Sequence, residues 1–246
     1  MNYSLLRYAL YAVPAMIVAL LVLLMEAMPL ELGRLSAEDG PVEDLTAASF
    51  VIATVGFAVA AWRAPMLYNT GRVWTPAMTI CWALLMFVCF GEEISWGQRV
   101  FDVATPQYLE RVNDQQEINV HDIGFVNDFL GGTHRWMSIY MWMTGLGLPF
   151  LALTNVGKSL LGYFRFPVSP WSYSVLFVGA YLYGAYYRVW FPIPDMTPPN
   201  APTEIRELLM GLGSAFFAVH TALWPRDVYT EGAYATPKTS LLQPRV

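Results

Sequence analysis

The chain has 246 residues, of which 56% are hydrophobic and 13% charged, and its mean hydropathy is +0.40. Soluble domains usually carry about 25% charged residues, so this composition excludes an ordinary soluble domain and indicates a membrane protein. The formal net charge is −5, and we expect membrane lipids and other membrane subunits as partners, and no nucleic acid.

Six apolar stretches are long enough to cross a hydrocarbon core about 30 Å thick, which needs roughly 20 helical residues. They are Leu5–Glu26, Thr46–Pro65, Trp74–Ser95, Trp136–Thr154, Trp171–Arg188 and Glu207–Trp224. Tryptophans near many of their ends are typical of rings at headgroup level. The sequence predicts an all-α, polytopic membrane helix bundle of about six transmembrane helices. We expect a single transmembrane domain at 1–225 and a polar cytoplasmic tail at 226–246.

Six spans place both termini on one side of the membrane. The segments on that side carry the larger share of lysine and arginine, which marks the cytoplasmic face. We therefore expect a protein of the plasma (bacterial inner) membrane with both termini in the cytoplasm. The connection 99–135, between the third and fourth spans, is then extracytoplasmic. It is too long for a plain turn and is predicted to be structured, with Thr105 as an N-cap and Pro106 as the first residue of a helix.

The outer ends of five spans carry ionisable side chains of both signs. Glu92 and Glu93 end the third span, Arg188 ends the fifth, and Arg206 precedes the sixth. A charge near the bilayer centre costs about 2.5–3.5 kcal/mol, so we expect these glutamates to face away from lipid. Adjacent helical residues point about 100° apart, so one glutamate can face the bundle interior while the other faces a partner helix or the long loop. The loop adds further polar side chains: Asn113, Gln116, Glu117, Asn119 and His121.

Two interpretations of this charged rim stay open. In the structural one, Glu92 and Glu93 pair with Arg188 or Arg206 and accept hydrogen bonds from loop amides. In the functional one, the glutamates and His121 or His134 hold a divalent metal or act as general acid and base. The catalytic candidates are Glu92, Glu93 and His121, and the metal candidates are these three and His134. The ligand-binding candidates are Trp96, Gln98, Asn113, Gln116, Glu117, Asn119, Arg188 and Arg206.

The string GEEISWGQR at Gly91–Arg99 resembles the signature of a functionally unassigned group of bacterial polytopic membrane proteins. The resemblance continues through Thr105–Pro106 and the pattern NxxQExNxH at Asn113–His121. Asp122 departs from it, because asparagine is expected there. The resemblance implies that a set of these side chains forms one unit: Glu92, Glu93, Trp96, Gln98, Asn113, Glu117, Asn119 and His121.

Three functions from different classes follow from these features. The leading hypothesis is a Glu/His/Asn/Gln polar site at the extracytoplasmic face that binds a metal or a lipid headgroup for hydrolysis or transfer. The second is an accessory or assembly subunit of a larger membrane complex, in which the charged rim is only structural. The third is an ion- or proton-coupled carrier. Separately, the tyrosine-rich run in the fifth span either lines a pocket for a lipid chain, quinone or pigment, or anchors the helix at the interface.

Overall fold

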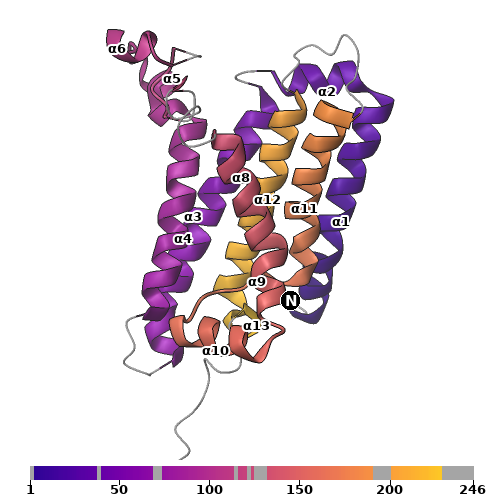
Figure 1. Ribbon diagram of the computed structural model, residues 1–246, viewed down its shortest axis with the longest axis vertical. Helices are drawn as coiled ribbons and strands as arrows, with labels where there is room; N and C mark the ends of the chain where they lie inside the picture. The colour runs from indigo at the N-terminus through magenta and orange to yellow at the C-terminus, as the bar shows by residue number, and fades with distance from the viewer. Residues whose placement is uncertain are drawn as a thin grey trace, which may run out of the picture.

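The computed structural model describes residues 3–37, 40–68, 74–113, 116–120, 123–124, 132–190 and 201–228. Most of these residues are helical and none forms a β-strand, and their one pairing of extended backbone is a single bridge between Asn113 and Ile123. The long helical segments stand side by side as an upright bundle (Figure 1). The predicted all-α class is confirmed for the part of the chain that the structure describes.

Six long helical segments build the bundle in the described residues. They are α1 (Tyr3–Ala27), α3 (Pro41–Tyr68), α4 (Trp74–Glu93), α8 (Thr133–Trp142) with η2 (Met143–Gly147) and α9 (Leu148–Leu151), α11 (Trp171–Ala185) with η3 (Tyr186–Trp190), and α12 (Ala201–Leu223). Each predicted span falls largely within one of them. Between α8 and α9 the helix passes through a π-helical turn, because Pro149 has no N–H with which to continue the ordinary ladder.

Short helices connect these segments at the two ends of the bundle. At one end lie α2 (Pro29–Leu35), α5 (Gln98–Phe101) and α6 (Gln107–Glu110), and at the other lie α10 (Asn155–Phe164), α13 (Pro225–Val228) and the N-terminus (Figure 1). The long connection after α4 is thus at the end opposite the N-terminus. Of the predicted tail 226–246, residues 229–246 lie outside the described residues.

One described helix, Pro41–Ala64 within α3, is long and apolar enough to cross a membrane by itself. Two more candidates arise if each of two bent pairs counts as one span. These pairs are Tyr11–Ala27 with Pro29–Leu35, bent by 116°, and Arg135–Leu151 with Asn155–Phe164, bent by 115°. These helices are compatible with a membrane protein.

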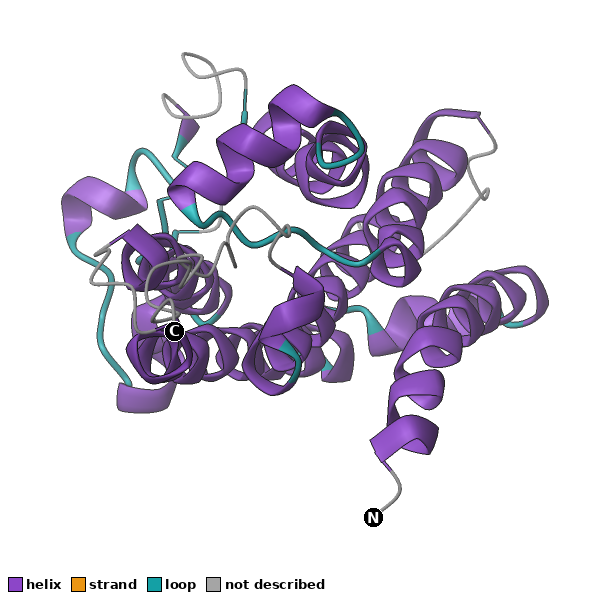
Figure 2. Ribbon diagram, turned by 90° about the horizontal axis from the view of Figure 1, so that it is seen from below, coloured by secondary structure: helices purple, strands orange, loops and turns teal. Residues whose placement is uncertain are grey.

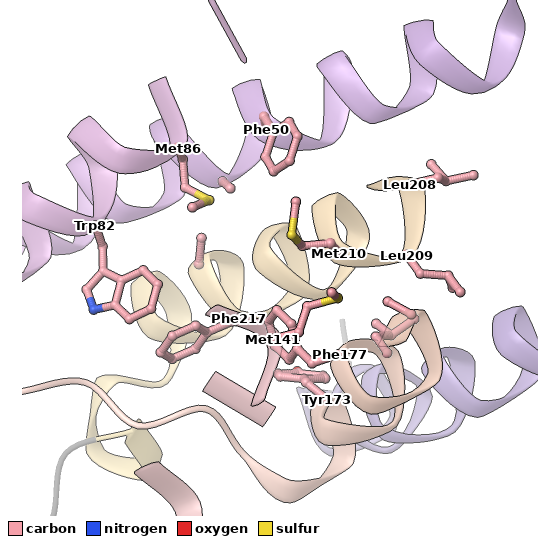
Figure 3. Close-up of a cluster of buried hydrophobic side chains, with 14 of the residues drawn as sticks. Phe50, Trp82, Met86, Met141, Tyr173, Phe177, Leu208, Leu209, Met210 and Phe217 are labelled. Carbon is pink, nitrogen blue, oxygen red and sulfur yellow. The ribbon is translucent and has the colours of Figure 1, made fainter. Parts of the chain in front are cut away.

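The apolar core lies between α3, α4, α8, α11 and α12 (Figure 3). Helix α3 packs along both α12 and α4, and α12 packs along α11. Phe57 of α3 stacks on Trp82 of α4 at 5.6 Å and meets Phe217 of α12 edge-on at 5.2 Å between ring centroids. Helix α1 lies at the edge of the bundle, where it packs mainly on α11 (Figure 2). This packing brings the start of α12 and the end of α4 to one end of the molecule.

Candidate functional site

The segment Gly91–Gly97 ends α4 in a left-handed turn. Ser95, Trp96 and Gly97 have φ values of 45°, 54° and 80°, which glycine adopts freely and other residues only with strain. The Trp96 ring folds back on the helix, and a Cβ on Gly91 would lie 2.9 Å from its Cε3 atom. Its indole Nε1 donates a hydrogen bond to Glu92 Oε1 at 2.7 Å. The glycines, the tryptophan and the first glutamate of this motif therefore act together to stop the helix and turn the chain.

Glu92 and Gln98 attach the following loop to this turn. Glu92 Oε2 accepts a hydrogen bond from the backbone N–H of Val120 at 2.7 Å. Gln98 Oε1 accepts one from the N–H of Ile118 at 2.6 Å. Both side chains thus satisfy backbone donors that come 28 and 20 residues later in the chain.

Thr105 has a different role from the predicted helix cap. Its hydroxyl donates to the carbonyl oxygen of Gln116 at 2.7 Å and accepts from Gln98 Nε2 at 2.6 Å. The cap position of α6 is Pro106, with no side-chain cap hydrogen bond. The prediction of Thr105 as the N-cap was wrong, because its hydroxyl instead links Gln98 to the backbone of Gln116.

Asn113 lies at the centre of the loop and is 4% exposed. Its Nδ2 donates to Asn119 Oδ1 at 2.6 Å and to the Asn119 carbonyl oxygen at 2.9 Å, and its Oδ1 accepts from the N–H of Glu117 at 3.2 Å. The Glu117 carboxylate accepts hydrogen bonds from Ser95 Oγ and, at 3.4 Å, from Asn119 Nδ2. The polar side chains of the motif thus bind one another and the loop backbone.

The structure therefore brings together most, but not all, of the residues grouped by the resemblance. Six side chains share the network: Glu92, Trp96, Gln98, Asn113, Glu117 and Asn119. Gln116 contributes its carbonyl oxygen. His121 lies outside the described residues, and so does the side chain of His134, which is the second residue of α8. Glu93 points to a different group of residues.

Glu93 lies beside two glutamates of α12. One carboxylate oxygen each from Glu93, Glu204 and Glu207 lie within 4.8 Å of one another, and all three residues are partly buried. Glu93 is the last residue of α4, and the other two are three residues apart near the start of α12, so they share one helix face. We call these three residues the carboxylate cluster.

The electrostatics of the carboxylate cluster favour a bound cation or bound protons. The buried Arg206 lies next to it and donates from Nη2 to Glu207 Oε1 at 3.4 Å. Among the described residues, Glu93 has no hydrogen-bond or ion-pair partner. Two ionised carboxylates 4.8 Å apart repel by about 3 kcal/mol at an effective dielectric constant of about 20. Oxygen-only ligand sets suit Mg²⁺, Ca²⁺ and Mn²⁺, so a divalent cation would remove this repulsion.

An apolar cavity of about 400 Å³ adjoins the cluster. It lies between α4 and α8, with α3 and α12 behind, and Met86 and Tyr140 contribute to its wall. Its polar lining consists mainly of Glu92, Glu93 and Glu207, which α4 and α12 bring from one end of the bundle. A pocket of this volume with a few polar groups at one end is typical of small-molecule sites.

The outer edge of this cavity is formed by exposed apolar side chains. Leu85 and Val88 of α4 are 43% and 45% exposed, and Ile139 and Trp136 of α8 are 42% and 54% exposed. In a bilayer such side chains face acyl chains. The cavity is therefore accessible from the side of the bundle, between α4 and α8.

The structure forms only part of the predicted ion pairs and of the predicted metal site. Arg206 pairs with Glu207, its neighbour in sequence, and Arg188 is exposed. The predicted metal set joined Glu92 to Glu93 and two histidines, whereas the structure joins Glu93 to Glu204 and Glu207. Glu92 instead accepts a hydrogen bond from the backbone of Val120 in the loop. Sequence reasoning missed Glu204, because the predicted sixth span began only at Glu207; its spacing of three from Glu207 places the two on one face of α12.

Comparison of the chain with protein-family models, with curated proteins and with solved structures gives no match.

Proposed function

We propose that this is a six-span integral protein of the bacterial inner membrane that binds a divalent cation on Glu93, Glu204 and Glu207. The cation holds the polar head of a membrane amphiphile, whose chain lies in the apolar cavity between α4 and α8. The composition, the apolar helix Pro41–Ala64 and the six long helical segments support the membrane placement. The distribution of lysine and arginine supports cytoplasmic termini and an extracytoplasmic site.

The observation that carries this proposal is the position of the Glu93 carboxylate. It has no hydrogen-bond or ion-pair partner among the described residues, two further carboxylates lie within 4.8 Å, and it lines an otherwise apolar cavity. A cation gives the Glu93 carboxylate a partner, and an amphiphile with a polar head and an apolar chain matches the polarity of the cavity. Neither requirement is met by a purely structural role for Glu93.

The proposed reaction class is hydrolysis or transfer of the headgroup. A divalent cation at this position supplies Lewis-acid activation of a phosphoryl or carbonyl oxygen. Glu93, Glu204 and Glu207 hold the cation, Arg206 offsets part of the carboxylate charge, and Met86, Ile139 and Tyr140 enclose the chain and exclude water. The loop network anchored by Glu92 fixes the end of α4 and hence the direction of Glu93.

Lipid retention tests this proposal. The purified chain is washed in detergent with and without EDTA, and the lipids that remain are identified by mass spectrometry. We expect one amphiphile class to stay with the wild type and to be lost with EDTA and in Glu93→Gln. Asp44→Asn is the matched control, since Asp44 is an exposed carboxylate in the first turn of α3. Equal retention with and without EDTA contradicts a cation-held headgroup.

An accessory subunit of a larger membrane complex is the second candidate, and the surface after α4 favours it. Val100, Phe101 and Tyr108 of the α5 and α6 region are 72%, 75% and 69% exposed, and this region lies beyond the end of α4 (Figure 1). Exposed apolar patches are typical of interaction sites. Purification from native membranes in a mild detergent tests this candidate, and a solitary, monodisperse chain contradicts it.

An ion- or proton-coupled carrier is the third candidate, and the same Glu93 carboxylate favours it, because a group that can hold a proton or a cation can also relay one. Flux measurements in liposomes separate it from the first candidate. A proton-dependent flux that Glu93→Gln abolishes supports carriage, and absence of flux contradicts it.

A further inference from the structure

A second cavity lies on the other side of the bundle, between α1 and α11. Its volume is about 480 Å³, and it is separate from the carboxylate cluster. Val18, Val22 and Glu26 line it from α1, at spacings of four residues that place them on one helix face. Eight residues of helix cover about 12 Å. The cavity is therefore an elongated groove that runs along the helices, with valines at one end and Glu26 at the other.

Aromatic side chains surround the polar end of this groove. Tyr183, Tyr186, Tyr187 and Trp190 line it from α11 and η3. The ring centroids of Tyr183 and Tyr187 are 4.7 Å apart, and those of Tyr186 and Tyr187 are 4.8 Å apart. The Tyr187 hydroxyl donates to Glu26 Oε1 at 2.8 Å. A carboxylate held among several aromatic rings attracts an organic ammonium group, through charge and through the ring faces.

The Tyr183 hydroxyl is the second observation that points to a ligand. Tyr183 is 3% exposed, lines the groove, and has a buried hydroxyl with no hydrogen-bond partner among the described residues. Buried hydroxyl groups in folded proteins are normally hydrogen-bonded. An acceptor oxygen on a ligand, next to its ammonium group, would satisfy this donor.

We propose that the groove between α1 and α11 binds a membrane lipid with an ammonium headgroup. Glu26 and the aromatic rings bind the ammonium, Tyr183 donates to an oxygen of the head, and one acyl chain lies along Val18 and Val22. The proposal rests on the membrane placement given above, because only then does the groove face lipid. It does not depend on a cation at Glu93.

Paired lipids that differ only in the headgroup test this proposal. The full chain, freed of lipid in detergent, is titrated with dilauroyl phosphatidylethanolamine and dilauroyl phosphatidylglycerol, and bound lipid is counted by native mass spectrometry. We expect the ammonium lipid to bind about tenfold more tightly than the glycerol lipid. Equal affinities in the wild type overturn the proposal.

Two variants locate the binding in the groove. Glu26→Gln keeps an acceptor for Tyr187 and removes the charge, so we expect it to abolish the preference for the ammonium lipid. Tyr183→Phe removes only a hydroxyl without a partner, so we expect weaker lipid binding together with an unchanged or higher thermal stability of the lipid-free chain. Full binding in Glu26→Gln overturns the proposal, as does full binding in Tyr183→Phe.

Asp44→Asn is the matched control for these variants, because Asp44 is an exposed carboxylate outside both cavities. We expect it to bind the ammonium lipid as the wild type does. If Glu93→Gln abolishes the headgroup preference while Glu26→Gln keeps it, the lipid binds at the carboxylate cluster, and the groove proposal is overturned while the proposed function stands.

Discussion

Replacement of Asn113 by alanine is the sharpest perturbation of the loop that follows α4. The side chain is 4% exposed, donates hydrogen bonds to the side chain and the carbonyl oxygen of Asn119, and accepts one from the N–H of Glu117. Its loss leaves polar groups of the 2%-exposed Asn119 without their partner. Each neutral hydrogen bond contributes about 1 kcal/mol, and an unsatisfied buried group costs about 1–3 kcal/mol. We expect Asn113→Ala to lower the free energy of local opening by about 2–4 kcal/mol.

Hydrogen exchange, followed by mass spectrometry, measures the free energy of local opening of this loop. A loss of 2–4 kcal/mol predicts exchange about 30- to 1,000-fold faster at the protected amides of Ile118 and Val120, and unchanged exchange in α12. Gln107→Ala is the control, because Gln107 lies in the same loop with an exposed side chain. If exchange near Val120 in Asn113→Ala rises by less than about threefold, the loop is not held by this network.

Three further predictions follow from other contacts. Gly91→Ala puts a methyl group 2.9 Å from the Trp96 ring, so we expect the ring to be displaced at a cost of about 1–3 kcal/mol. The displacement should appear as faster hydrogen exchange at the Val120 amide. An exchange rate equal to that of the wild type contradicts this packing. Tyr140→Phe removes the 2.7 Å hydrogen bond to Ser214 and should lower the free energy of unfolding by about 1 kcal/mol, measured by thermal unfolding against Tyr108→Phe, whose side chain is exposed. Tyr108→Cys tests the topology in a chain whose two cysteines, Cys81 and Cys89, are replaced by alanine. We expect it to react with a membrane-impermeant maleimide added to inner-membrane vesicles whose periplasmic side faces outward. Reaction only when the cytoplasmic side faces outward reverses the proposed topology.

The sequence predicted the helical segments well, because a run of about 20 apolar residues has few alternatives to a helix. It also predicted that the two adjacent glutamates point in different directions. Which glutamate faces the loop and which faces a neighbouring helix depends on the rotation of α4 in the bundle. That rotation is set by packing such as the contact of Trp82 with Phe57 and Phe217.

The membership of the carboxylate cluster depends on tertiary structure in the same way. Glu93 and Glu204 are far apart in sequence, and they meet because α3 packs along both α4 and α12. The predicted sixth span began at Glu207, so Glu204 fell in the preceding loop and was left out of the candidates. In the structure α12 begins at Ala201, which brings Glu204 onto the same helix face as Glu207.

Binding of Mn²⁺ to the purified chain tests the central claim most directly, because the paramagnetic signal of free Mn²⁺ disappears from the electron spin resonance spectrum when the ion binds. We expect about one tightly bound ion for each wild-type chain, with binding retained in Asp44→Asn and lost in Glu93→Gln. Binding of the same strength in wild type and Glu93→Gln, or none in either, contradicts a cation site at Glu93, Glu204 and Glu207.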